Sequence, residues 1–184
     1  MKDLLLRDTE TLFELFVDLF GKVLINEPLK ELEDLDITPA QVQALLFLAR
    51  HAPNYVGDLA EGLGISYPAA TKAVDRLVAK DLVTRQENAR DRRQSELTVT
   101  ESGLALLERV RTERRGRLEN ILAKMSPDET KAMHRGLRSF VTAAFMGDRD
   151  LIAALCQRCG CDCYTECIVN QSHLALLGCE MDRV

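Results

Sequence analysis

Apolar side chains near the start of the chain recur at steps of three and four residues, at Leu12, Leu15, Phe16, Leu19, Phe20, Val23 and Leu24. This spacing predicts a helix with a single apolar stripe. The stripe is long for a small domain, so two partners remain open: the chain's own core or a second copy of the chain. Asn26-Glu27-Pro28 is predicted to end or kink the helix, because proline has no amide hydrogen to donate.

A second group of helices follows, and polar residues mark where each one begins. Thr38-Pro39-Ala40-Gln41 has the order of a capping box and predicts a helix to about Arg50, which buries Val42, Leu45, Leu46 and Leu48. A short helix over 56–63, a turn at Gly64 and a helix capped by Ser66 that reaches about Lys80 predict a helix–turn–helix. This last helix is expected to bury Ala70, Val74, Leu77 and Val78.

Two β-prone stretches come next, Leu82–Arg85 and Glu96–Val99, and between them only Ala89 is apolar. They predict a hairpin with a charged tip, which is a wing. Thr100 and Ser126 then each cap a long helix, the first to about Lys124 and the second to about Met146. The predicted fold is therefore mainly α with a small β wing. The residues around Gly147 divide a first domain, 1–147, from a tail, 148–184.

The charge is distributed unevenly, although the net charge of −5 does not by itself suggest DNA binding. Residues 1–50 carry ten acidic and five basic side chains, whereas residues 66–95 carry seven basic and four acidic ones. A local excess of cations is the electrostatic footprint expected for phosphate contacts. The acidic run of Glu31, Glu33, Asp34 and Asp36 is interpreted as a solvated loop.

The outward side chains at the start of the 66–80 helix are the candidates for contacts in a DNA major groove. They are Ser66, Tyr67, Ala69, Thr71 and Lys72, with Arg76 one turn further on. Their hydroxyls and cations can bond to phosphates or base edges. A solvated polar face is the alternative, but the neighbouring glycine turn and wing favour DNA. In the wing, Arg90, Arg92 and Arg93 suit the negative potential of a narrow minor groove.

The order of helix, helix–turn–helix, wing and long closing helices resembles the MarR family of winged-helix transcription regulators. The helix pair carries the resemblance together with Asp91-Arg92-Arg93-Gln94, which leads through Leu97-Thr98 to Thr100-Glu101-Ser102-Gly103. The resemblance covers roughly residues 10–147. It implies a homodimer, held by its N- and C-terminal helices, that binds a palindromic double-stranded operator as a repressor. It also implies that Arg93 enters the minor groove with Asp91 orienting it, and that the chain is not an enzyme.

All six cysteines lie in the last 29 residues, at Cys156, Cys159, Cys161, Cys163, Cys167 and Cys179. An iron–sulfur cluster is the first interpretation, since it takes four thiolates from a cysteine-dense loop, although the spacing matches neither ferredoxin pattern. A structural zinc ion is the alternative, with His173 able to replace one thiolate. A metal-free disulfide switch is the third.

No secretory signal and no apolar run of membrane length is visible, so the chain is expected in the cytoplasm, with no membrane partner. Clustered cysteines there bind metals or react more often than they form structural disulfides. The predicted function is a transcription regulator whose DNA affinity responds to redox or metal state through the cysteine cluster. The rivals are a zinc knuckle that recruits a protein and an iron–sulfur electron-transfer enzyme, for which no paired acid and base residues are evident.

Overall fold

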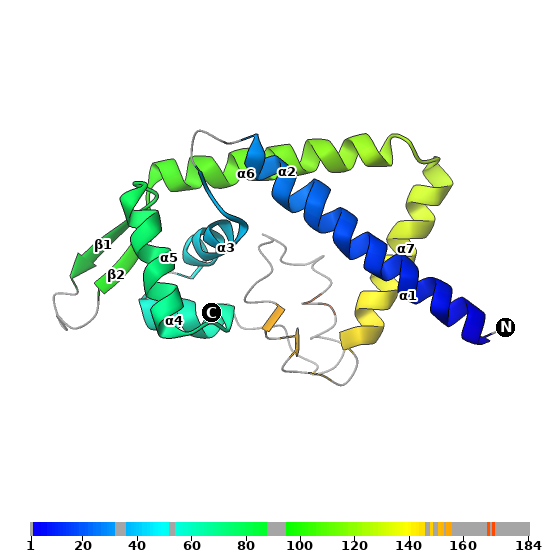
Figure 1. The fold of residues 1–184 in the computed structure, drawn as a ribbon, viewed down its shortest axis with the longest axis horizontal. Coiled ribbons are helices and arrows are strands. Elements are labelled where there is room, and N and C mark those ends of the chain that lie inside the picture. The colour runs from blue at the N-terminus through cyan, green and yellow to red at the C-terminus, as the bar shows by residue number, and fades with distance from the viewer. Residues whose placement is uncertain are drawn as a thin grey trace.

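The computed structural model describes residues 2–31, 36–51, 54–87 and 95–145, together with residues 148, 151–152, 154–155, 169 and 171. An N-terminal helical arm consists of α1 (Lys2–Leu19), the π-helix η1 (Phe20–Asn26) and α2 (Glu27–Lys30). The body consists of α3 (Pro39–Leu48), α4 (Val56–Leu63), α5 (Tyr67–Ala79), β1 (Val83–Glu87) and β2 (Ser95–Val99). The long helix α6 (Glu101–Leu122) connects the body to α7 (Pro127–Phe145), which α1 approaches at the far end (Figure 1).

The helix starts of the body follow the predicted caps. The Gln41 amide donates to the Thr38 hydroxyl at 3.3 Å, and the Thr38 amide donates to the Gln41 side-chain oxygen at 2.9 Å. Gly64 ends α4 with φ 63°, a left-handed conformation that glycine adopts without strain. The Ser66 hydroxyl accepts from the Ala69 amide at 3.4 Å and starts α5. The predicted helix–turn–helix is confirmed.

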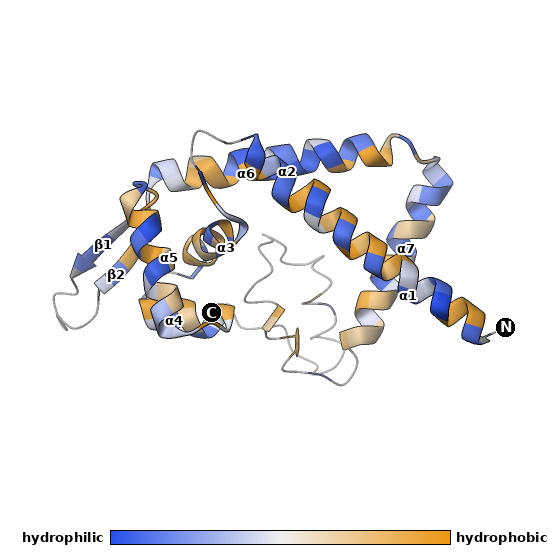
Figure 2. Ribbon diagram, in the orientation of Figure 1, coloured by the Kyte–Doolittle hydropathy of each residue, from blue (hydrophilic) through white to orange (hydrophobic). Residues whose placement is uncertain are grey.

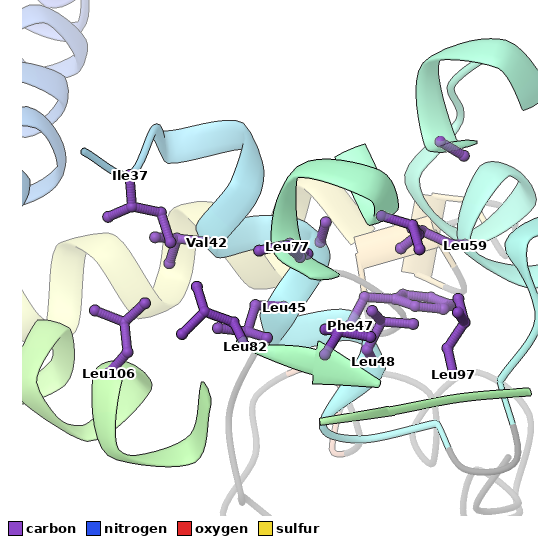
Figure 3. Packing of buried hydrophobic residues seen from close by; sticks show 14 of the residues in the cluster. Ile37, Val42, Leu45, Phe47, Leu48, Leu59, Leu77, Leu82, Leu97 and Leu106 are labelled. Carbon is purple, nitrogen blue, oxygen red and sulfur yellow. The ribbon is translucent and has the colours of Figure 1, made fainter. Parts of the chain in front are cut away.

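The core of the body lies where α3, α4 and α5 meet the wing and the first turns of α6 (Figure 3). Leu45, Leu59 and Leu77, one from each helix, are completely buried. Leu97 of β2 and Leu106 of α6 close the same cluster. Two expectations need correction, because Leu46 is only partly buried and Val78 is 38% exposed. Val78 directly follows Leu77, which occupies the inward position, so Val78 turns away from the core.

The wing is an antiparallel pair in which Val83 lies opposite Val99 and Glu87 opposite Ser95. Both strands therefore extend further toward the tip than predicted. At the base, the Thr100 amide donates to the Leu82 carbonyl at 3.1 Å, and the Thr100 hydroxyl donates to the Asp81 carbonyl at 2.7 Å. A Cβ atom on Gly103 would lie 2.4 Å from that Leu82 carbonyl oxygen. Only glycine allows α6 to begin this close to the wing.

The N-terminal arm does not end at Pro28, so of the two outcomes predicted for Asn26-Glu27-Pro28, an end or a kink, the end is wrong. The winding changes earlier, at the π-helix, and the chain stays helical through Pro28 to Lys30. Pro28 has no amide hydrogen to donate in this stretch. The Glu27 amide just before it bonds five residues back, to the Lys22 carbonyl, as in a π-helix. The Arg114 side chain of α6 donates to the Leu24 carbonyl at 3.0 Å. An arginine from another helix thus adds a donor to a stretch where the proline supplies none.

A second arginine of α6 fixes α2 in place. Arg117 is 2.8 Å from the Glu27 carboxylate and also pairs with Glu31. Asp36 pairs with Lys80 of the body. Glu31 and Asp36 therefore make ion pairs, but their side chains stay exposed, at 53% and 102%, which agrees with the interpretation of this acidic run as solvated at these two residues.

Figure 2 shows the apolar residues along α1 in orange. The side chains of this stripe are largely exposed in the single chain. Leu12 is 66% exposed, Leu15 60% and Leu19 54%. Within the arm the stripe becomes buried only at Leu24. Phe13 does find a partner, since its ring centroid is 4.6 Å from that of Phe140 in α7. Of the two partners left open for this stripe, the chain's own core is not the one that covers it.

Candidate nucleic-acid interface

The N-terminal half of α5 lies on the surface of the body, with its opposite side in the core. Ala70, Val74 and Leu77 are completely buried on the inner side. On the outer side the exposed residues are Ser66, Tyr67, Ala69, Lys72 and Arg76. The first amide hydrogens of a helix point outward beyond its N-terminal end and have no partner within the helix, so an anion is favoured there. The geometry therefore presents a serine and a tyrosine at the helix end that is suited to phosphate, with Lys72 in the middle of α5 and Arg76 in its last turn.

Thr71 differs from the other candidate residues of α5. It is half-buried, and its hydroxyl donates to the Tyr67 carbonyl at 3.0 Å. This bond within the helix uses the only hydrogen of the hydroxyl. Thr71 can therefore accept a hydrogen bond from a ligand while donating to its own helix.

An ion pair that the sequence did not suggest joins α5 to the wing. Asp75 lies on the exposed side of α5, and its carboxylate is 3.4 Å from the Arg85 guanidinium of β1. The pair offsets the one acidic charge between Lys72 and Arg76. Both side chains are partly solvated, so the pair contributes little to stability. Nothing in the local sequence indicates it, because strand pairing and helix packing bring the two residues together.

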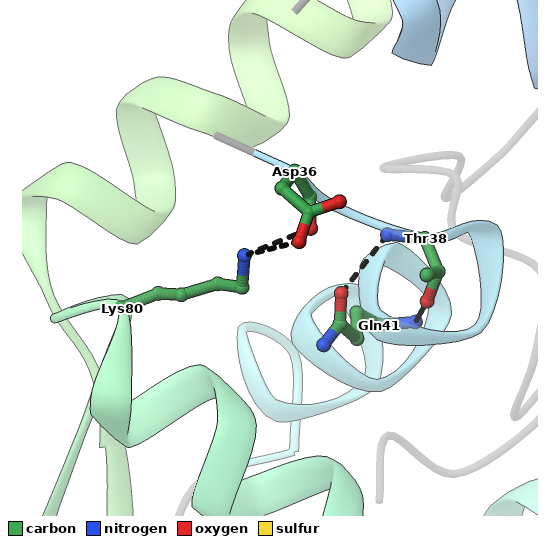
Figure 4. A network of polar contacts seen from close by, with 4 residues as sticks. All are labelled: Asp36, Thr38, Gln41 and Lys80. Atoms are coloured by element: carbon green, nitrogen blue, oxygen red, sulfur yellow. Dashed lines mark hydrogen bonds and ion pairs between the residues drawn. The ribbon is translucent and has the colours of Figure 1, made fainter. Parts of the chain in front are cut away.

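The other end of α5 is tied to the segment between α2 and α3 (Figure 4). The Lys80 ammonium donates to the Asp36 carbonyl at 2.8 Å and lies 3.8 Å from its carboxylate. Asp36 has φ 41°, a left-handed backbone conformation that aspartate adopts more readily than most residues other than glycine. A cation at the C-terminus of a helix is also favourable for the helix dipole. Lys80 thus links the C-terminal end of α5 to the segment between α2 and α3.

The wing tip and the cysteines both lie outside the described residues. The pairing of Glu87 with Ser95 brings the two ends of the tip together, and Arg90, Asp91, Arg92 and Arg93 lie between them in the sequence. All six cysteines fall in the part of the tail that is not described. Among the described residues, no three His, Cys, Asp or Glu side chains converge as metal ligands would. The described ranges also contain no helix long and apolar enough to span a membrane.

Comparison with known proteins matches the region that contains the helix–turn–helix. The sequence profile of the MarR family matches residues 35–94. The chain is 32% identical to the transcriptional repressor MdtR of Bacillus subtilis over 56% of this chain and 66% of MdtR. It is 30% identical to the regulator YfiV of the same organism over 65% of this chain and 76% of YfiV.

Solved structures share the fold over a longer stretch. YusO of B. subtilis superposes with a TM-score of 0.65 at 27% identity, over 78% of this chain and 99% of YusO. A MepR mutant of S. aureus, solved bound to an oligodeoxyribonucleotide, gives a TM-score of 0.58 at 22% identity, over 74% of this chain and 97% of MepR. Among the sequence relatives, MdtR is a transcriptional repressor and YfiV a transcriptional regulator, both of the helix–turn–helix type. The chain belongs to the MarR family of winged helix–turn–helix transcriptional regulators.

Proposed function

We propose that this chain acts in the cytoplasm as a homodimeric repressor that binds a palindromic double-stranded operator. The observation that carries the proposal is the outer side of α5, which is held on a buried core and exposes Ser66, Tyr67 and Lys72 toward its start and Arg76 in its last turn. A helix presented in this way fits the major groove, where its first turns meet base edges. The repressor activity named for MdtR and the oligonucleotide held by MepR support the same assignment.

The exposed stripe of α1 supports the dimer. Leu12, Leu15 and Leu19 point away from the chain's own core, and Phe140 of α7, beside Phe13, is itself 52% exposed. Apolar side chains gathered on one face mark a protein interface more often than a free surface. A two-fold dimer through α1 and α7 would bury this face and supply two α5 helices, one for each half-site of a palindrome.

Selection from a random DNA library, followed by binding measurements on the selected duplex over a range of salt concentrations, tests the proposal. Lys72→Ala and Arg93→Ala are each expected to weaken binding and to reduce the salt slope by about one unit, since each removes one cation from the DNA. Arg115→Ala is the control, because Arg115 is 77% exposed and lies on α6, outside α5 and the wing. Unchanged slopes for both variants would exclude α5 and the wing as the DNA-binding surface.

A second part of the proposal concerns what the regulator senses, and it rests on the dense cysteine tail. Six thiols within one short segment exceed the four that an iron–sulfur cluster or a zinc ion takes, so the donor chemistry fits either group. The ligands would come from Cys156, Cys159, Cys161, Cys163, Cys167 and Cys179. An iron–sulfur cluster, our first choice, would supply sensitivity to oxygen. Bringing thiolates together without a cation is opposed by their mutual repulsion.

Anaerobic purification, with metal and sulfide analysis and a visible spectrum, tests the sensing part. We expect iron with sulfide, and a DNA affinity that changes on exposure to air. One zinc per chain without iron would move the assignment to a structural zinc site. The absence of both metals, with loss of free thiols in air, would instead identify a disulfide switch.

A further inference from the structure

The described residues of the tail are anchored on the C-terminal end of α7. Ile152 is completely buried, and Val169 and Phe145 are 6% and 3% exposed in the same small cluster. Val141 of α7 and Leu151 of the tail pack against it. This cluster is separate from the core of the body. We call Ile152 and Val169 the two anchors.

A polar contact strengthens the second anchor. The Arg138 guanidinium of α7 donates to the side-chain oxygen of Gln171, two residues beyond Val169. Arg138, Val141 and Phe145 are spaced three and four residues apart, so they share one face of α7. Both anchors therefore lie on a single helical face, although seventeen positions of sequence separate them.

Five of the six cysteines fall between the two anchors in the sequence, at Cys156, Cys159, Cys161, Cys163 and Cys167. We call the segment between the two anchors the cysteine loop. Because its two ends are held on one helix, they stay close together, and this removes part of the entropy that its thiolates would otherwise lose on converging.

On a different side of α7, Phe140 contacts Phe13 of α1, with ring centroids 4.6 Å apart. Helical spacing places Phe140 well away from the face that holds the anchors. The helix therefore stands between the tail on one side and the exposed arm α1 on the other. A shift of its last turns alters the packing of the helices proposed to form the dimer.

We propose that the Arg138–Val141–Phe145 face of α7 is a docking surface for the chain's own tail, and that it transmits the state of the cysteine loop to the dimer. The transmission rests on the cysteine sensing proposed above, whereas the docking does not. When the loop loses its metal or forms a disulfide, the anchors loosen, α7 frays from its C-terminal end, and the contact with α1 weakens. DNA affinity then changes through the dimer, while α5 itself stays as it was.

The experiment compares full-length Ile152→Asp with Leu155→Asp. Leu155 lies one helical turn beyond Ile152, is 38% exposed, and is absent from the anchor cluster. Hydrogen exchange is measured for peptides covering residues 134–145, and affinity for the selected operator duplex is measured before and after exposure to air. Val169→Ala, a milder change at the other anchor, repeats both measurements if Ile152→Asp does not fold.

Ile152→Asp is expected to speed amide hydrogen exchange in the last turns of α7 by at least about tenfold, because the buried carboxylate drives the tail off the helix. It should also remove the response of DNA affinity to air, whereas Leu155→Asp should match the parent protein in both. Unchanged exchange in both anchor variants would overturn the docking. A full response to air in those variants would overturn the transmission. If the parent protein itself does not respond, cysteine sensing fails, and the docking is judged by exchange alone.

Discussion

The winged-helix body and the α1 arm of this chain place their apolar side chains in opposite ways. In the body, Leu45, Leu59 and Leu77 are fully buried within one chain. In the arm, Leu15 and Leu19 are more than half exposed, although they are leucines at the same helical spacing. Periodicity predicts that a helix has an apolar face, but it does not say which molecule will cover that face.

This contrast separates two kinds of stability. The body gains its hydrophobic free energy when a single chain folds. The arm gains most of it only when a second chain is present, so its stability depends on protein concentration. Substitutions in the two regions should consequently be seen by different measurements.

The largest effect is expected in the body. Leu77→Ala removes a fully buried side chain from the centre of the core and should lower the free energy of unfolding by about 2–5 kcal/mol. Chemical denaturation followed by circular dichroism measures the loss. Leu15→Ala is the matched change in the arm, and at low protein concentration it should cost far less. Equal losses at the two positions would contradict the contrast.

The second effect belongs to the arm. Leu15→Glu combined with Leu19→Glu places two carboxylates in the exposed stripe and should raise the dimer dissociation constant by about 100-fold, which corresponds to about 2.7 kcal/mol. Sedimentation at micromolar concentration should then detect single chains of 20.6 kDa. Glu14→Gln, at an exposed polar position of the same helix, is the control. A double variant that remains dimeric would assign the stripe to another partner.

A smaller effect is expected where α6 leaves the body. Gly103→Ala forces a methyl group against the Leu82 carbonyl and should destabilise the fold by about 1–3 kcal/mol. Gly116→Ala, in the same helix, meets no atom within 4 Å and should stabilise it by about 0.5–1 kcal/mol. If thermal unfolding shows that Gly103→Ala lowers the stability and Gly116→Ala raises it, the need for glycine lies at the base of the wing. Two changes of the same sign would show that Gly103 is not needed for close packing.

The smallest effect concerns the start of α7. Hydrogen bonds from the hydroxyl and amide of Ser126 hold the pKa of Glu129 below its ordinary value of 4.5. A lowered pKa means that this stabilisation is complete above pH 4.5 and is lost as the pH falls through the value in the folded protein. Glu129→Gln should therefore flatten the acid side of the stability profile and leave neutral pH nearly unchanged. If stability at acid pH falls equally in Glu129→Gln and in the parent protein, the hydrogen bonds between Ser126 and Glu129 do not contribute to the pH dependence.

Local signals were sufficient to predict the body. Thr38, Gly64, Ser66 and Thr100 each mark a helix boundary through a bond made within a few residues of sequence, and each prediction was confirmed. The outward position of Lys72 and Arg76 followed from the same periodicity. The exposure of Val78 was missed because an apolar residue at the edge of the stripe fits either side.

Contacts between distant segments could not be predicted. The pair of Lys80 with Asp36, the bond from Arg114 to Leu24 and the burial of Ile152 against Phe145 each depend on how whole helices cross. The π-helix has no recognisable sequence signal, because its residues also suit an α-helix. The assignments of Arg93 and of the six cysteines stay predictions, since these residues lie outside the described ranges.

The bond between Arg114 and the Leu24 carbonyl also restricts the order in which this protein can evolve. Pro28 supplies no amide hydrogen to this stretch of helix, and Arg114 supplies a donor to the Leu24 carbonyl from α6. Replacing Arg114 while the proline remains removes the donor of a part-buried acceptor, a change that costs about 1–3 kcal/mol. Replacing Pro28 first adds an amide to the stretch and makes it depend less on position 114. The two sites are therefore coupled, and a lineage that keeps the proline is committed to a donor on α6.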